Sequence, residues 1–154
     1  MTSTDIFEIK YLESEIELKL LSDKIKKDSN NNLEGCIIPK KLKSTDFVIC
    51  VCNKITKEIC SFIWFGIYKN IFFDIDLKEI TYTHINYSYT LTKYRNNGFN
   101  KKLRLWVETY CVENNIEYII SVPLHDSNSK YVLEKLGYIK INTYYMKKIN
   151  IFNN

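Results

Sequence analysis

The chain of 154 residues is 45% hydrophobic and 26% charged, a composition typical of one soluble domain and not of a disordered or fibrous protein. Its formal net charge of +4 is too mild to indicate a nucleic-acid partner by itself. The longest apolar run, residues 59–68, has about half the length of a membrane span, and the N-terminus lacks the basic start and apolar stretch of a secretory signal. We therefore expect a single domain over residues 1–154, soluble, cytoplasmic and without a membrane partner.

The first half of the chain predicts strand, helix, strand and strand. Residues 6–12 alternate like a strand, and residues 13–29 have helical spacing, either as one helix or as two. Residues 43–52 and 58–67 predict two strands joined as a hairpin by a short polar turn. Residues 69–79 fit either a loop or a short strand.

The second half predicts a long strand, a helix, a strand, a short helix and a final strand, over residues 79–92, 99–115, 116–122, 127–136 and 138–149 respectively. Pro123 stops the middle strand, and either Asp126 or Ser127 caps the short helix. Gly137 follows that helix, where its conformational freedom is useful. The whole order, β-α-β-β-β-α-β-α-β, indicates an α/β protein with helices on both faces of a central sheet.

The cysteines follow no metal-binding or redox pattern. No two of them form a C-x-x-C pair, and the chain has only two histidines, His84 and His125. We expect no metal site and reduced, buried thiols at all five cysteines, Cys36, Cys50, Cys52, Cys60 and Cys111.

One window of the chain is strongly basic. Residues 80–107 contain no Asp or Glu but have five cations, Lys93, Arg95, Lys101, Lys102 and Arg104. They lie around a strand-to-helix turn, where the helix dipole disfavours cations unless an anion is also present. A phosphate would accept from the free N–H groups of the helix start, and Gly98 would let it approach closely. The alternative is a set of solvated lysines beside a glycine that only permits the turn.

Residues 89–138 resemble the second half of the GNAT superfamily of N-acetyltransferases. The family's [QR]-x-x-G-x-[GA] motif stands here as Arg95-Asn96-Asn97-Gly98-Phe99-Asn100, and its Y-E-K-x-G-F ending as residues 133–138. The last helix is closest to the ribosomal-protein and N-terminal acetyltransferases. The resemblance implies an α/β (α+β) fold with a mixed, mostly antiparallel sheet, splayed between the strands at about 80–92 and 116–122.

The resemblance also implies acetyl-CoA as co-substrate. Its pyrophosphate would lie on the backbone N–H groups of the motif turn, and its pantetheine arm would pair with the end of the long strand. The asparagine that the family carries in the last helix aligns with Asp126, with Asn128 nearby. The implied cofactor-binding residues are Ser88, Tyr89, Thr90, Arg95, Asn96, Asn97, Gly98, Phe99, Asn100, Lys101, Asp126 and Asn128.

The catalytic residues are less evident. Deprotonation of an amine needs a base, for which the long strand offers Glu79 and His84. The family's tyrosine acid aligns with Leu133, and Ser129, one helical turn earlier, shares its face and could hold a water or the thiol. Asn100 stands where the family has Gly or Ala.

The predicted function is acetyl transfer from acetyl-CoA to a primary amine by direct attack on the thioester, by a monomer or a homodimer. The acceptor could be a protein N-terminus, a lysine, a polyamine, an amino sugar or a small amine. Two alternatives stay open: a GNAT-fold protein that binds CoA or a partner without catalysis, and an α/β module that binds RNA or another polyanion through residues 80–107.

Overall fold

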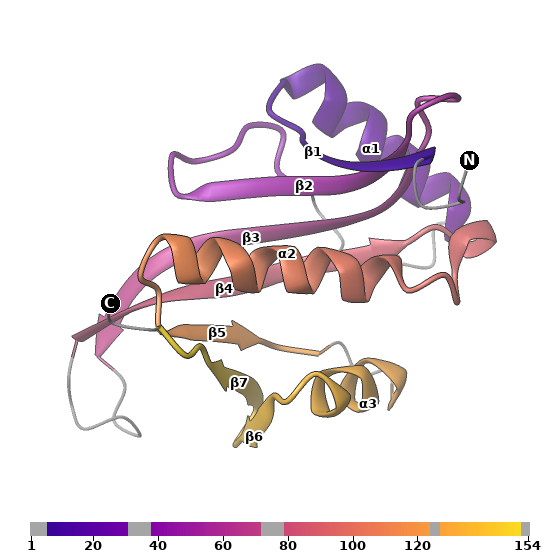
Figure 1. Ribbon diagram of the computed structural model, residues 1–154. Coiled ribbons are helices and arrows are strands. Elements are labelled where there is room, and N and C mark those ends of the chain that lie inside the picture. The colour runs from indigo at the N-terminus through magenta and orange to yellow at the C-terminus, as the bar shows by residue number, and fades with distance from the viewer. Residues whose placement is uncertain (1–5, 31–37, 72–78, 124–126, 152–154) are drawn as a thin grey trace. The chain divides into compact units, whose positions relative to one another are not determined.

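The computed structural model describes residues 6–30, 38–71, 79–123 and 127–151 (Figure 1). Its elements are β1 (Phe7–Tyr11), α1 (Glu15–Asp28), β2 (Asp46–Asn53), β3 (Ile59–Ile71), β4 (Glu79–Thr90), a 3-10 turn (Thr92–Tyr94), α2 (Phe99–Glu113), β5 (Tyr118–Ser121), α3 (Ser127–Lys135), β6 (Ile139–Ile141) and β7 (Tyr144–Lys148). None of the helices within these ranges is long and apolar enough to cross a membrane.

The strands form one seven-stranded sheet in the order β1-β2-β3-β4-β5-β7-β6. The pairs β1–β2, β5–β7 and β6–β7 are antiparallel, and β4–β5 is parallel. This confirms the predicted class, an α/β (α+β) fold with a mixed, mostly antiparallel sheet. The parallel ladder runs from Tyr82↔Tyr118 to Ile85↔Ser121, and β4 continues beyond its last β5 partner to Thr90.

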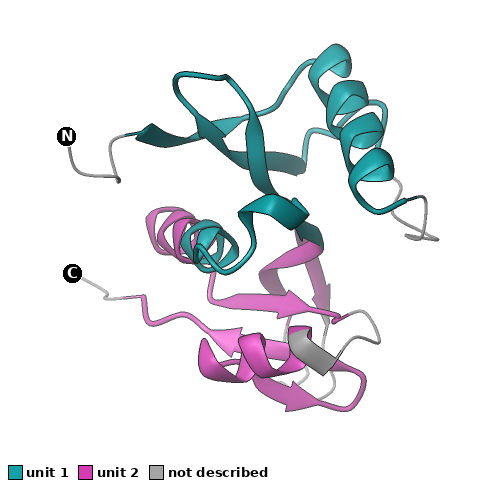
Figure 2. Cartoon of the chain, turned by 90° about the vertical axis from the view of Figure 1, so that its right-hand side faces the viewer, with its two compact units in different colours: residues 1–64, 87–104 teal, residues 65–86, 105–154 magenta. Residues whose placement is uncertain are grey.

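The chain divides into two compact units, coloured separately in Figure 2. Unit 1 comprises residues 1–64 and 87–104, and unit 2 comprises residues 65–86 and 105–154. The divisions fall inside β3, β4 and α2, so each of these elements contributes residues to both units.

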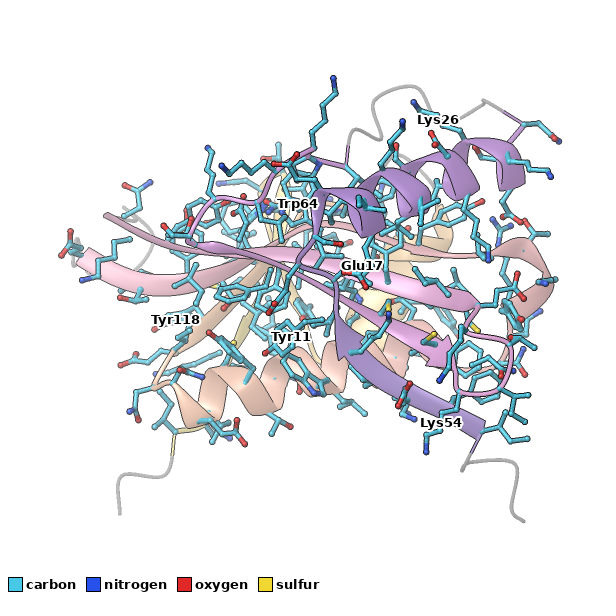
Figure 3. The ribbon with its side chains drawn as sticks, turned by 90° about the horizontal axis from the view of Figure 1, so that it is seen from above. Tyr11, Glu17, Lys26, Lys54, Trp64 and Tyr118 are labelled. Carbon is cyan, nitrogen blue, oxygen red and sulfur yellow. The ribbon has the colours of Figure 1, made fainter. Side chains whose placement is uncertain are left out.

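In unit 1, α1 covers one face of the strands. A capping box starts the helix: the Ser14 hydroxyl accepts from the Glu17 N–H at 3.1 Å, and the Glu17 carboxylate accepts from the Ser14 N–H at 3.4 Å. Figure 3 shows Glu17 in the first turn and Lys26 in the last, the favourable order for the helix dipole. The predicted helix is therefore continuous, and it buries Leu18, Leu21 and Ile25 against Val48, Cys50, Cys52 and Phe62 of β2 and β3.

In unit 2, the second part of α2 and the end of α3 pack on the strands. Phe65 of β3 lies with its ring centroid 5.7 Å from that of Tyr110 on α2, and the Thr83 hydroxyl lies 3.2 Å from the Cys111 sulfur. Lys147 of β7 links α2 to the residue that follows α3, because its ammonium donates to Glu108 at 2.8 Å and to the Leu136 carbonyl at 2.7 Å.

The final strand predicted over residues 138–149 is wrong in one respect: it is the hairpin β6–β7. The turn contains Asn142 with φ +52°, a conformation that asparagine tolerates better than most residues. Gly137, with φ +82°, ends α3 as expected, and the Tyr138 N–H donates to the Leu133 carbonyl at 3.1 Å.

The four cysteines in the described ranges are buried and free, as predicted. Burial raises the pKa of the Cys50 thiol to about 12 and that of the Cys111 thiol to about 11. Cys36 lies outside the described residues.

Candidate cofactor turn and catalytic residues

The connection from β4 to α2 contains two residues with left-handed backbone. Asn96 has φ +64° and Gly98 has φ +72°, and the Gly98 carbonyl accepts the first helical bond from Lys102 N–H at 2.9 Å. A Cβ placed on Gly98 would meet no heavy atom within 4 Å. The backbone conformation therefore favours glycine at position 98, and the space beside it is open.

This connection presents consecutive free backbone donors. Among the residues that the structure describes, no protein acceptor bonds the N–H groups of residues 96–101. The Asn97 side chain holds the turn from within, since its amide donates to the carbonyls of Tyr94 at 3.1 Å and Arg95 at 3.0 Å. Free N–H groups at the positive end of a helix dipole are what an anion requires.

The five cations of this window are not equally available. Lys101 and Lys102 are exposed in the first turn of α2. Arg95 is also exposed, but it lies over the Tyr89 ring, 5.5 Å from the centroid, and its Nε donates to the Thr90 carbonyl at 3.3 Å. Two lysines and the backbone therefore make up most of the positive potential at the turn.

Asn100, which stands where the GNAT motif has Gly or Ala, is hydrogen-bonded to Arg104. Arg104 is buried, and its Nε donates to the Asn100 Oδ1 at 3.0 Å. The Asn100 side chain is thus tied along the helix to i+4, and its backbone N–H stays among the free donors.

Two carboxylates that the local sequence pattern missed lie at the same connection. Glu58 accepts from Lys24, Lys93 and the Tyr94 hydroxyl, and these hydrogen bonds lower the pKa of Glu58 to about 2. Asp28 accepts from Thr92 and the Tyr89 hydroxyl. Burial alone would raise the pKa of Asp28, but these hydrogen bonds hold it below its usual value. Residues 80–107 contain no Asp or Glu, but in the folded protein Asp28 and Glu58 lie beside them.

Glu58 should make stability depend on acid pH. Its pKa falls from 4.5 to about 2 on folding, so its contribution is fully present above pH 4.5 and is lost as pH falls towards 2. Urea unfolding of the wild type and Glu58→Gln should give a free-energy gap at pH 7 that shrinks at pH 3. A gap of equal size at both values would contradict this assignment.

The predicted pantetheine residues lie on the part of β4 that extends past β5. The Ser61 hydroxyl, buried on β3, donates to the Tyr89 carbonyl at 3.1 Å and lies 2.8 Å from the Thr90 hydroxyl. Ser88 is half-buried. A strand that outruns its partner leaves backbone groups for another extended chain. Of the two residues expected from the last helix, Asn128 lies in the first turn of α3, and Asp126 lies outside the described residues.

His84 lies in a small cluster on β3 and β4. Its Nδ1 is 2.8 Å from the Asn86 Oδ1, and its ring meets Tyr68 edge-on with centroids 6.3 Å apart. Tyr68 also packs on Tyr82, at 5.9 Å. Glu79 is exposed at the first residue of β4, about 16 Å along the strand from His84. The two base candidates are therefore separated, and within the described ranges only His84 has aromatic ring contacts.

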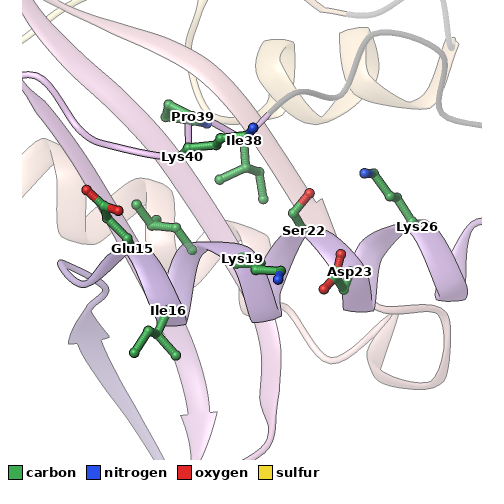
Figure 4. A pocket seen from close by; sticks show the side chains of 10 residues that line it. Glu15, Ile16, Lys19, Ser22, Asp23, Lys26, Ile38, Pro39 and Lys40 are labelled. Atoms are coloured by element: carbon green, nitrogen blue, oxygen red, sulfur yellow. The ribbon is translucent and has the colours of Figure 1, made fainter.

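A groove of about 570 Å³ follows α1 in unit 1 (Figure 4). Glu15, Lys19, Asp23 and Lys26 line it together with residues 38–40. None of the predicted site residues belongs to this lining. This groove is thus separate from the candidate cofactor turn.

The fold is shared with acetyltransferases of known structure. An acetyltransferase of the GNAT family from Staphylococcus aureus Mu50 superposes with a TM-score of 0.71 and 16% identity, over 94% of this chain and 99% of that one. The chain has the GNAT fold.

Two further structures with the GNAT fold are similar. One is a KacTA–DNA complex, with a TM-score of 0.68, 9% identity and 93% of each chain covered. The other is a mutant AtaT toxin bound to acetyl-CoA and the C-terminus of the antitoxin AtaR, with a TM-score of 0.65, 10% identity and 94% of each chain covered. No protein-family model and no curated protein matches the sequence. At these identities the similarity establishes the fold and not the reaction.

Leu133, the residue that the sequence resemblance aligns with a tyrosine acid, is 1% exposed on α3. Ser129 lies one turn earlier and is half-buried. Tyr131 cannot replace the missing tyrosine from its place on another side of the helix, where it is exposed beneath Lys135.

The burial of Leu133 determines what a tyrosine there would do. We expect Leu133→Tyr to destabilise the protein by about 1–3 kcal/mol, because the larger ring must displace packed neighbours. Urea unfolding measures this change, with Leu133→Met as a control of similar volume. A Leu133→Tyr protein as stable as the wild type would show that the ring finds space, and its turnover would then report on an added acid.

Proposed function

We propose that the chain is an acetyl-CoA-dependent N-acetyltransferase that transfers an acetyl group to a primary amine. The observation that carries this proposal is the row of free N–H groups at residues 96–101, beside Lys101 and Lys102 at the start of α2. The GNAT fold supports it, since one neighbour with this fold was solved with acetyl-CoA.

The chain's own groups have separate tasks in this proposal. The N–H groups of residues 96–101 donate to the pyrophosphate oxygens, and the backbone of Ser88–Thr90 pairs with the pantetheine amides. Acetyl-CoA supplies the activated acetyl thioester. The amine nitrogen forms a bond to the thioester carbon, the carbon–sulfur bond breaks, and the sulfur leaves as a thiolate.

His84 is the proposed base. A carbonyl oxygen can only accept, so the Asn86 Oδ1 at 2.8 Å assigns the proton of a neutral imidazole to Nδ1. The Nε2 lone pair is then available for the proton of the attacking amine. No tyrosine acid is needed for the thiolate to leave, since a thiol with a pKa near 8.5 is an adequate leaving group.

A non-catalytic GNAT protein is the second candidate, and the buried Leu133 favours it. Such a protein would use the same turn to bind CoA but would release no thiol when amines are added.

Two measurements test the proposal in order. Acetyl-CoA at 100 times its Kd should raise the melting temperature by roughly 5–10 °C. Amines should then release CoA thiol from acetyl-CoA, tested with peptide N-termini, lysine, polyamines and amino sugars. Aminoacyl-tRNA belongs in the panel because one GNAT-fold neighbour, AtaT, was solved with acetyl-methionyl-tRNA. No shift at millimolar acetyl-CoA would reject both candidates, and a shift without thiol release would support the second.

A further inference from the structure

The 3-10 turn Thr92–Tyr94 is held by two carboxylates that come from distant parts of unit 1. Asp28, the last residue of α1, receives three hydrogen bonds on its Oδ2, each of 2.9 Å. Their donors are the Tyr89 hydroxyl and both the N–H and the hydroxyl of Thr92. One carboxylate oxygen thus joins the end of β4 to the start of the turn.

Glu58 holds the rest of the same turn. It lies between β2 and β3, and its Oε2 accepts from the Lys93 ammonium at 2.7 Å and the Tyr94 hydroxyl at 2.6 Å. Its Oε1 accepts from Lys24 of α1 at 2.8 Å. Every residue of the turn Thr92–Tyr94 therefore donates to Asp28 or Glu58.

Electrostatics alone does not explain this arrangement. The free N–H groups begin at Asn96, two residues after the turn. Negative side chains near an anion-binding turn oppose the anion, and Glu58 also neutralises Lys93, which could otherwise attract it. Two carboxylates at this place therefore lower affinity for an anion unless they improve its binding by another route.

We propose that Asp28 and Glu58 are positioning residues of the cofactor site, which fix the turn Thr92–Tyr94 so that the N–H groups of residues 96–101 converge on the pyrophosphate. This inference rests on the proposed binding of acetyl-CoA. The inference also extends the proposed function, because it assigns α1 and the β2–β3 hairpin a part in acetyl-CoA binding. Neither element carries a residue of the cofactor motif.

Glu58→Gln and Asp28→Asn test whether the two carboxylates act by positioning the turn or by their charge. The two explanations predict opposite changes in the affinity for acetyl-CoA. Both variants keep the side-chain shape and remove a negative charge. Positioning predicts acetyl-CoA binding about tenfold weaker, as expected for the loss of charge-assisted hydrogen bonds. Charge alone predicts tighter binding. Calorimetry at a temperature where all proteins are folded measures the affinity, and unchanged or tighter binding in both variants overturns the inference.

Glu17→Gln is the matched control. It removes an acid of the same unit that pairs with Lys10 at 3.2 Å and closes the capping box, so it should lower stability without changing affinity. If Asp28→Asn does not fold, Thr92→Val removes one of the same hydrogen bonds from the exposed side. If Glu17→Gln lost as much affinity for acetyl-CoA as the other two variants, the loss would be explained by lower stability. That result would overturn the inference.

A substrate that lacks the pyrophosphate distinguishes positioning of the cofactor from a general effect on the structure. If the enzyme is active, KM for acetyl-CoA should rise in Glu58→Gln while KM for acetylpantetheine stays unchanged. Equal changes for both substrates would overturn the inference. A wild-type protein that binds no acetyl-CoA would instead overturn the proposed function, and this inference with it.

Discussion

Gly98→Glu should abolish acetyl-CoA binding. The residue has φ +72° and open space beside it, so a glutamate side chain could enter that space and place a carboxylate next to the free N–H groups of residues 96–101. Repulsion of the pyrophosphate adds to the strain of a non-glycine residue at positive φ. We expect affinity to fall by more than about 100-fold, which corresponds to roughly 3 kcal/mol.

Gly98→Gln and Gly98→Asn separate the causes of this loss. Glutamine has the bulk and the backbone strain of glutamate without its charge, and asparagine tolerates positive φ better than either. Calorimetric affinities should decrease in the order Gly, Asn, Gln, Glu. Binding by Gly98→Glu at the wild-type level would show that the phosphates do not lie at this turn.

His84→Gln should lower kcat for acetyl transfer by about 100-fold or more near neutral pH, the usual contribution of a general base. Because the base only removes the amine proton, the loss should shrink as pH approaches the pKa of the acceptor amine. The measurement is the pH profile of kcat for one amine that the wild type accepts.

Glu79→Gln is the control for this prediction. Glu79 is exposed at the first residue of β4, whereas His84 lies among Tyr68, Tyr82 and Asn86. We expect Glu79→Gln to keep the wild-type profile. If Glu79→Gln lowered kcat and His84→Gln did not, Glu79 and not His84 would be the base.

Much of the fold could be predicted because it depends on local patterns. The alternation of residues 79–92 and the helical spacing after Phe99 set β4 and α2, and both elements formed close to the predicted bounds. The β6–β7 hairpin was missed because its turn, Asn142-Thr143, has neither glycine nor proline to interrupt a run of strand-forming residues.

The surroundings of the turn were beyond local patterns. The hydrogen bond between Asp28 and Thr92 spans 64 positions, and that between Glu58 and Lys93 spans 35. No periodicity or spacing rule links residues that far apart, and only the packing of α1 and the β2–β3 hairpin brings them together. The charge of a sequence window therefore overstated the positive potential that the folded turn presents.

The burial of the cysteines has a practical consequence for enzymology. A thiol reacts with a disulfide reagent as the thiolate, and the buried, raised-pKa thiols of Cys50 and Cys111 offer almost none at pH 8. Cys52 and Cys60 are also buried, with raised pKa values. With Cys36→Ser removing the fifth, the folded protein should react very little with a chromogenic disulfide reagent. Free CoA could then be followed continuously as it forms, without a quench or a coupling enzyme.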